Sequence, residues 1–195
     1  IWVSGTDGVA VGFSDSVLRR SGNNWTAAVV TPKVGTVLRA IWGSDAQNVW
    51  IVGGGQEGPN GEDFTGYPGK ILFYNGTDAT ESYKLAEADG ALRGVWGSGK
   101  SNVWAVGDNG VLLRYTGSGW SRIDSGTKFG LRGVWGSSAN DVYVVGQGGT
   151  VLHYDGQVWK RQDTGTGVSL VGVFGVGKDV FAYGYSGSIL HKLTP

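Results

Sequence analysis

The 195-residue sequence contains neither cysteine nor methionine. Without cysteine there is no disulfide framework, no thiolate nucleophile and no cysteine-based metal site. Without methionine the chain lacks its own start residue, so we expect a processed or trimmed product. Proline occurs only 4 times and no apolar run reaches the length of a membrane span, so collagen-like and membrane-inserted chains are excluded.

An excess of charge of either sign is also lacking. The chain carries 16 basic and 16 acidic side chains and has a pI near 6.9. Nucleic-acid binding requires a basic face that neutralises phosphates, and a polybasic membrane anchor requires the same excess. We therefore expect no nucleic-acid partner. The two histidines, His153 and His191, occupy equivalent positions of a repeat, which favours a structural role, so we expect no metal and no cofactor.

Glycine and tryptophan are abundant, with 37 and 9 copies, and they recur with a fixed period. The stretch 92–125 (LRGVWGSGKSNVWAVGDNGVLLRYTGSGWSRIDS) is repeated 39 residues later as 131–164 (LRGVWGSSANDVYVVGQGGTVLHYDGQVWKRQDT). Such a period is typical of propellers and solenoids. Glycines that end the second strand of each copy align the rest of the chain, and they are Gly12, Gly53, Gly107, Gly146 and Gly184.

Each copy contains four short apolar stretches joined by turn-forming residues, a pattern that indicates four antiparallel strands. Strands that are apolar on both faces need cover on both sides, which a ring of four-stranded blades supplies. The sequence therefore predicts an all-β, five-bladed β-propeller as a single domain. Its repeats span approximately 1–37, 38–91, 92–130, 131–169 and 170–195.

The last repeat ends after its third strand, so we expect the last blade to lack its outer strand. This leaves Ser188–Leu193 as an edge strand. Exposed edges favour pairing with another strand. We expect this edge to pair with flanking chain or with another subunit.

The residues VWGSS…DVYVVG…GTVLHYDGQVW resemble the repeats of bacterial exported propellers, which are related to Asp-box (sialidase-type) and photosystem II assembly-factor propellers. The resemblance covers all five repeats and implies a propeller that hosts a binding function, since this fold carries unrelated activities. An Asp-box reads Ser-x-Asp-x-Gly-x-x-Trp. Here Gly156 to Trp159 keeps the second half, whereas Tyr154 stands at the Asp position, so the box is degenerate.

Aromatic residues recur at two positions of the repeat, at the end of the first strand and within the second. Recurrence favours packing between blades, and stacking against sugars is the alternative. The predicted structural core consists of Trp42, Trp50, Trp96, Trp104, Trp135, Tyr143, Phe174 and Phe181.

Three arginines, Arg39, Arg93 and Arg132, share one position on the innermost strands of consecutive repeats. In a propeller these strands line the central channel, so the three guanidinium groups are candidates for binding an anion at its mouth. The alternative is that each arginine pairs locally with a turn carbonyl or with an Asp of the next blade.

The second repeat holds an insertion at 54–69, between its second and third strands. Binding residues concentrate in loops held by a rigid scaffold, so this segment is a candidate site, and a tolerated surface insertion is the alternative. Its candidate residues are Glu57, Glu62, Asp63, Phe64 and Tyr67.

These observations favour a non-catalytic binding or protein-interaction scaffold module that is extracellular, periplasmic or on the cell surface. The alternative is a carbohydrate-binding lectin with repeated sites between blades. A sialidase-like glycoside hydrolase is least favoured, because no positioned carboxylate pair stands out of the repeat, and we expect no enzyme. The expected partner is thus a protein or a carbohydrate.

Overall fold

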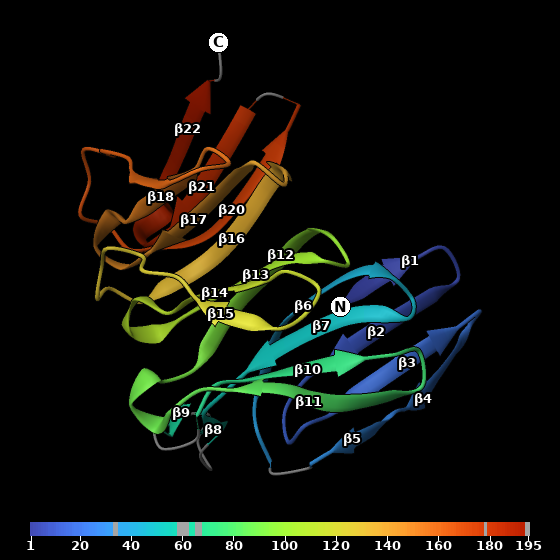
Figure 1. The fold of residues 1–195 in the computed structure, drawn as a ribbon. Helices are drawn as coiled ribbons and strands as arrows, with labels where there is room; N and C mark the ends of the chain where they lie inside the picture. The colour runs from blue at the N-terminus through green and yellow to red at the C-terminus, as the bar shows by residue number, and fades with distance from the viewer. Residues whose placement is uncertain (33–34, 58–62, 65–67, 178, 194–195) are drawn as a thin grey trace. The chain divides into compact units, whose positions relative to one another are not determined.

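The computed structural model describes residues 1–195 apart from 33–34, 58–62, 65–67, 178 and 194–195 (Figure 1). The described chain groups into two compact units, 1–93 and 94–195. Strands that are neighbours in sequence pair antiparallel in both units. Four short 3-10 helices interrupt them, namely η1 (Glu87–Asp89), η2 (Asp108–Gly110), η3 (Gln147–Gly149) and η4 (Tyr185–Gly187).

The first unit contains two large sheets. The first sheet has the expected four strands in sequence order, namely β1 (Trp2–Ser4), β2 (Asp7–Val11), β3 (Val17–Ser21) and β4 (Asn24–Ala27). The second sheet is built on β6 (Leu38–Asp45), β7 (Asn48–Gly53), β10 (Lys70–Tyr74) and β11 (Asp78–Lys84). The insertion lies between β7 and β10, and its described backbone includes a hairpin of β8 (Gln56–Glu57) and β9 (Asp63–Phe64).

A fifth strand in the second sheet departs from the four-strand expectation. Strand β5 (Val29–Thr31) pairs parallel with the outer strand β11, with Val29 opposite Asp78 and Thr31 opposite Thr80. Residues 29–31 belong to the first repeat by sequence but join the sheet of the second. An outer strand of this chain therefore accepts a further strand along its edge.

The second unit contains three sheets. The third sheet is β12 (Leu92–Gly99, of which residues 94–99 belong to this unit), β13 (Asn102–Gly107), β14 (Leu112–Tyr115) and β15 (Trp120–Arg122). The fourth sheet is β16 (Leu131–Ser138), β17 (Asp141–Gly146), β18 (Val151–Tyr154) and β19 (Trp159–Arg161). The fifth sheet has three strands, β20 (Leu170–Val176), β21 (Asp179–Gly184) and β22 (Ile189–Leu193).

The Trp-Gly pair of the repeat has a steric cause. A Cβ atom at Gly136 would lie 2.6 Å from the Trp96 ring, and one at Gly175 would lie 2.1 Å from the Trp135 ring. In the first unit the Trp2 ring lies against Gly43 in the same way. The glycine after the aromatic residue thus leaves room for the aromatic ring of the preceding sheet.

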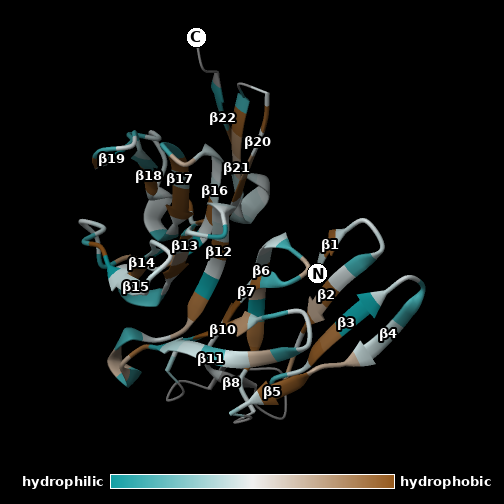
Figure 2. Cartoon of the chain, turned by 45° about the vertical axis from the view of Figure 1, so that its right-hand side comes forward, coloured by the Kyte–Doolittle hydropathy of each residue, from teal (hydrophilic) through white to brown (hydrophobic). Residues whose placement is uncertain are grey.

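The second strands show how each sheet is covered. In β13 and β17 every residue from the second to the last is buried, on both faces of the sheet, as the continuous apolar sequence predicts. Figure 2 shows the apolar colouring along β17. In β21 only Val180 and Ala182 are buried, while Tyr183 is 47% exposed. The fifth sheet is therefore covered on one face only, within the described residues of its unit.

The burial of the predicted core aromatics also differs from sheet to sheet. Trp50, Trp104 and Tyr143 are buried, whereas Trp42, Trp96, Trp135 and Phe181 are half-buried. Phe174 is 45% exposed, contrary to a core role, because it lies on the uncovered face of the fifth sheet, stacked on Phe181 at 5.4 Å. No helix among the described residues is long and apolar enough to span a membrane.

Candidate functional site

The fifth sheet ends at β22, and no described strand pairs with the other side of it. The residues of the second strand that each third strand pairs with identify equivalent positions in the third, fourth and fifth sheets. Leu112 lies opposite Val106 in the third sheet, Val151 opposite Val145 in the fourth, and Ile189 opposite Tyr183 in the fifth. Ile189 is therefore the counterpart of Leu112 and Val151.

The counterparts of Ile189 accept a hydrogen bond from the chain that follows the fourth strand. The amide of Ile123 donates to the Leu112 carbonyl oxygen and that of Gln162 to the Val151 carbonyl oxygen, both at 2.9 Å. Leu112 is fully buried, whereas Ile189 is 71% exposed. The edge of β22 thus presents an apolar side chain and a carbonyl group where the other sheets carry a paired strand.

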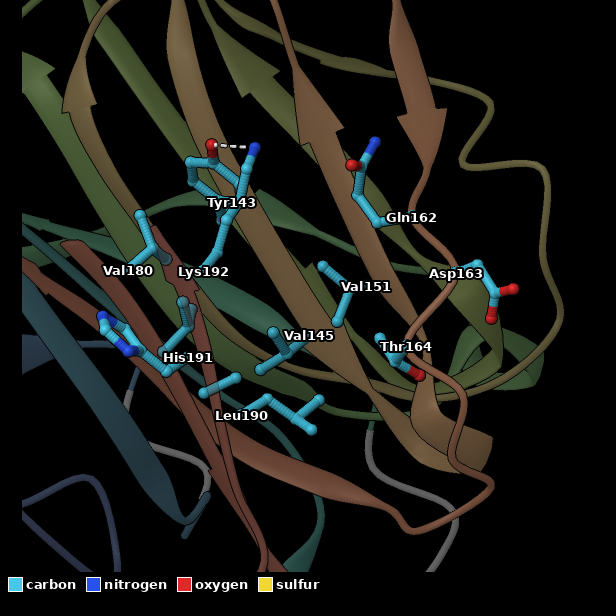
Figure 3. Close-up of a pocket in the computed structure, with 12 residues that line it drawn as sticks. Tyr143, Val145, Val151, Gln162, Asp163, Thr164, Val180, Leu190, His191 and Lys192 are labelled. Carbon is cyan, nitrogen blue, oxygen red and sulfur yellow. Dashed lines mark hydrogen bonds between the residues drawn. The ribbon is translucent and has the colours of Figure 1, made fainter. Parts of the chain in front are cut away.

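Beside this edge, a cleft of about 350 Å³ lies between the fourth and fifth sheets (Figure 3). Its size falls within the range of small-molecule and side-chain pockets. The cleft is lined by apolar and polar side chains. The apolar ones are Val145, Val151, Val173, Val180, Ala182 and Leu190, and the polar ones are Tyr143, Gln162, Asp163, Thr164, His191 and Lys192.

A cation lies at one end of the cleft. The Lys192 Nζ donates to the Tyr143 hydroxyl at 2.9 Å and lies 5.0 Å from the centre of that ring (Figure 3). Such a cation–aromatic contact is favourable where water is partly excluded. The Tyr143 ring is covered on its other side by His153, whose ring is stacked on it at 4.3 Å.

Each histidine is paired with an aspartate of its own sheet. His153 Nε2 lies 2.7 Å from Asp141 Oδ1, and His191 Nε2 lies 3.1 Å from Asp179 Oδ1. Burial raises the pKa of Asp141, but hydrogen bonds from Ser137 and His153 outweigh it, so this pKa lies below its ordinary value. No group of three or more metal-binding side chains occurs in the part of the chain that the structure describes. Each His–Asp pair joins two neighbouring strands of one sheet.

The three candidate arginines are not shown to form one site. Arg39 follows Leu38 in β6, where the pairing register shifts, and Arg132 occupies the same kind of irregularity in β16. The Arg39 Nε donates to the Gly54 carbonyl oxygen at 3.3 Å, as the local-pairing alternative expects. Arg39 and Arg93 belong to the first unit and Arg132 to the second, so their convergence on an anion stays a prediction.

The candidate residues of the insertion are described only in part. Glu62 and Tyr67 lie outside the described residues. Glu57, Asp63 and Phe64 are described by their backbone, which forms the β8–β9 hairpin. Their role in binding also stays a prediction.

Sequence reasoning identified the open edge of β22 but missed the cleft behind it. One signal was present in the sequence. Ile123, which follows the fourth strand of the third sheet, packs into the core between the third and fourth sheets, whereas its counterpart after the fourth sheet is the polar Gln162.

No protein-family model matches the chain, and no curated protein matches it. Two solved structures of YCF48, a photosystem II assembly factor, are similar to it. YCF48 bound to D1 peptide shares 16% identity at a TM-score of 0.66, covering 99% of this chain and 62% of that one. YCF48 from Cyanidioschyzon merolae shares 14% identity at a TM-score of 0.67, covering 98% of this chain and 65% of that one.

This chain spans less than two thirds of the length of either YCF48 structure. At these identities the similarity shows the fold. A bacterial origin stays a prediction. The all-β chain, with its successive antiparallel sheets, has the β-propeller fold that the YCF48 assembly factors have.

Proposed function

We propose that this chain is a non-catalytic protein-interaction module that binds an extended segment of a partner protein as an added strand along β22. The observation that carries the proposal is the cleft of about 350 Å³ that lies along β22, a strand with no described neighbour on its outer side. In strand addition, main-chain hydrogen bonds supply affinity, and pockets for alternate side chains supply specificity. Strand β22 has main-chain groups that no described strand pairs with, and the cleft lies beside it.

Two further observations support this proposal. The edge of β11 already accepts β5 as an additional strand, so an outer strand of this chain is able to pair with an added segment. A solved protein of the same fold, YCF48, contains a bound D1 peptide. We also propose that the module acts outside the cytoplasm, in the periplasm or at the cell surface.

The backbone geometry of β22 provides a direct test. In an antiparallel pair, the residues whose backbone groups face one neighbour alternate along the strand. The Val151 carbonyl group faces β19, so the backbone groups of His153, two residues further on, face β19 as well. The backbone groups of their counterparts in β22, Ile189 and His191, therefore point away from β21. Replacing His191 with proline removes an outward N–H group, whereas replacing it with alanine keeps that group.

We would select peptides from a random phage-displayed library on the immobilised chain and measure their affinities by fluorescence anisotropy. Loss of one main-chain hydrogen bond is expected to weaken binding to His191→Pro by roughly tenfold relative to His191→Ala. Equal affinities for the two variants would exclude strand addition at β22. Near-UV circular dichroism checks that both variants fold.

The same peptides distinguish the alternative sites. Deleting residues 56–68 leaves affinity unchanged if β22 is the binding edge and weakens it if the insertion is the site. A glycan array tests the lectin alternative: repeated sugar binding without peptide binding would replace the present proposal. Hydrolysis of a fluorogenic sialoside by the intact chain would replace the present proposal with the glycosidase alternative.

A further inference from the structure

We infer that a pocket between the first and second sheets is a second binding site, which takes the aromatic ring of a protein side chain or of a free small molecule. The pocket has a volume of about 130 Å³ and is lined only by residues of the first unit. The inference goes beyond the proposed function, because this pocket shares no residue with β22 or with the cleft beside it.

One pair of stacked side chains recurs in four of the five large sheets. An aromatic residue of the second strand lies opposite a third-strand residue whose flat side chain contacts its ring. The four pairs, with the distance between ring centres or from the guanidinium carbon to the ring centre, are Trp50 and Phe73 at 4.7 Å, Trp104 and Arg114 at 4.8 Å, Tyr143 and His153 at 4.3 Å, and Phe181 and His191 at 4.3 Å.

The first sheet has the third-strand member of this pair but lacks the aromatic one. Arg19 of β3 lies opposite Val9 of β2, whereas Arg114 lies opposite Trp104. Val9 is therefore the counterpart of Trp104. A valine side chain occupies much less volume than an indole, and the pocket is found at this position, lined by Val9 and Arg19.

The interface between the third and fourth sheets shows what fills the equivalent position there. Trp104 is 1% exposed, and its ring contacts the Arg114 guanidinium group at 4.8 Å and the Tyr154 ring of the following sheet at 5.2 Å. Arg114 also donates to the Tyr154 hydroxyl at 3.3 Å. The position thus holds an aromatic ring that a guanidinium group and a tyrosine both contact.

Both of these contacting groups are present in the first unit. Tyr74 lies opposite Val49 as Tyr154 lies opposite Val142, so Tyr74 is the counterpart of Tyr154. Burial raises the pKa of the Tyr74 hydroxyl, and the Arg19 guanidinium group beside it opposes that rise. Arg19 and Tyr74 both line the pocket, as their counterparts contact Trp104.

The pocket does not depend on where the sequence begins. Trp2 lies opposite Val9 in an antiparallel pair, so any residue before Ile1 would lie opposite Val11 or beyond it. The pocket extends in the other direction, toward Asp7, and its opposite wall belongs to the second sheet. Its shape is therefore set by two sheets of the described chain.

The size and lining of the pocket suit a single aromatic ring. A cavity of about 150 Å³ in an apolar core holds benzene. The Arg19 guanidinium group favours the electron-rich face of such a ring, as Arg114 does for Trp104. Asp7 also lines the pocket and can accept a hydrogen bond from a ring hydroxyl. Phenol combines these features and is the simplest probe.

Titration of phenol into the isotope-labelled chain, followed by NMR, tests the inference. The signals to follow are the amides of Val9 and Gly76 and the indole N–H of Trp2, all of which line the pocket. We expect a Kd on the order of 1 mM, as for a small ligand that buries most of its surface. No response of these signals to phenol would overturn the inference.

Cyclohexanol is the matched control probe, because it has the same number of carbon atoms and a hydroxyl group but no aromatic face. It is expected to bind roughly two- to fivefold more weakly than phenol, the contribution of a cation–aromatic contact. Equal affinities for the two compounds would show that the pocket takes any apolar group and would overturn the assignment to an aromatic ring.

Variants of the chain give the reciprocal test. Val9→Trp supplies the ring from the chain itself, as the second and third sheets do, and is expected to abolish the response to phenol. If this variant fails to fold, Arg19→Gln decides. Arg19 is exposed, and its loss is expected to weaken phenol roughly two- to fivefold and to leave cyclohexanol unchanged. Lys84→Gln removes an exposed charge of the same unit away from the pocket. An equal loss in Lys84→Gln would overturn the inference.

A further probe distinguishes the two sources of the ring. Binding of N-acetyl-tyrosine amide at the same signals, at least as tightly as phenol, supports a protein side chain as the occupant. Binding of phenol but not of the amide supports a free aromatic molecule. The variant His191→Pro, which tests strand addition at β22, is expected to leave phenol binding unchanged, so failure of one proposal is distinguishable from failure of the other.

Discussion

The glycine that follows each first-strand aromatic residue is fixed by contact with the preceding sheet. Gly136 lies under the Trp96 ring and close to the Asp141 carbonyl oxygen, so a Cβ atom there would approach ring and backbone at 2.6 and 2.7 Å. The repeat of Trp-Gly was visible in the sequence, but its cause was not, because the ring that requires the glycine belongs to another repeat.

Replacing Gly136 with alanine is expected to lower the free energy of unfolding by about 1–3 kcal/mol, the cost of overpacking a close contact. Gly99, the last residue of β12, has no atom within 4 Å of a Cβ, so Gly99→Ala is the control for the loss of a glycine and is expected to cost little. Urea denaturation measures both. A cost for Gly99→Ala as large as that for Gly136→Ala would show that the loss of glycine itself, and not the Trp96 contact, is responsible.

At the scale of the strand, the sequence predicted most of what the structure contains. The second-strand glycines aligned the repeats correctly because second strands and turns recur at each copy. The parallel pairing of β5 with β11 was not predictable from this pattern, since Val29–Thr31 carries no repeat signal and its partner lies some fifty residues further on. The cleft beside β22 escaped notice for a similar reason: it is formed by residues of two repeats.

The segment that follows the fourth strand stabilises the 3-10 turn of its sheet. Ser125 Oγ donates to the Gly110 carbonyl oxygen at 2.7 Å, and Thr164 Oγ1 donates to the Gly149 carbonyl oxygen at 3.1 Å. A Cβ atom at Gly149 would lie 1.9 Å from the Thr166 carbonyl oxygen, whereas one at Gly187, the counterpart in the fifth sheet, meets no atom within 4 Å. Among the described residues, the turn of the fifth sheet therefore lacks the contact that holds the turn of the fourth.

Gly149 and Gly187 have nearly the same left-handed backbone, with φ of +66° and +69°. Alanine at either position is expected to cost about 1–2 kcal/mol for this conformation. Gly149→Ala is expected to cost a further 1–3 kcal/mol or so, because the methyl group collides with a backbone carbonyl. Thermal and urea denaturation of the two variants measure the difference. Equal destabilisation would mean that the segment after β19 moves aside freely and does not hold the turn.

At the scale of the whole molecule, stability is expected to vary from sheet to sheet, because in a repeat protein each sheet is stabilised mainly by contacts with its neighbours. In the second unit, the core between the third and fourth sheets includes Trp104, Leu131 and Val144, all nearly or fully buried. Between the fourth and fifth sheets the buried cluster is Val145, Leu170 and Ala182, bordered by the cleft.

Native-state hydrogen exchange should follow this gradient. Amides of β17 are expected to exchange only on global unfolding, whereas amides of β22, which border solvent on one side, exchange through local opening at a lower free energy. Mass spectrometry of peptic fragments covering 141–146 and 189–193 measures the two rates. Binding of a strand to β22 should slow exchange in 189–193 and leave 141–146 unchanged. Equal protection of the two fragments in the free chain would show that the edge of the fifth sheet is already covered in solution, and the open edge on which strand addition depends would not exist.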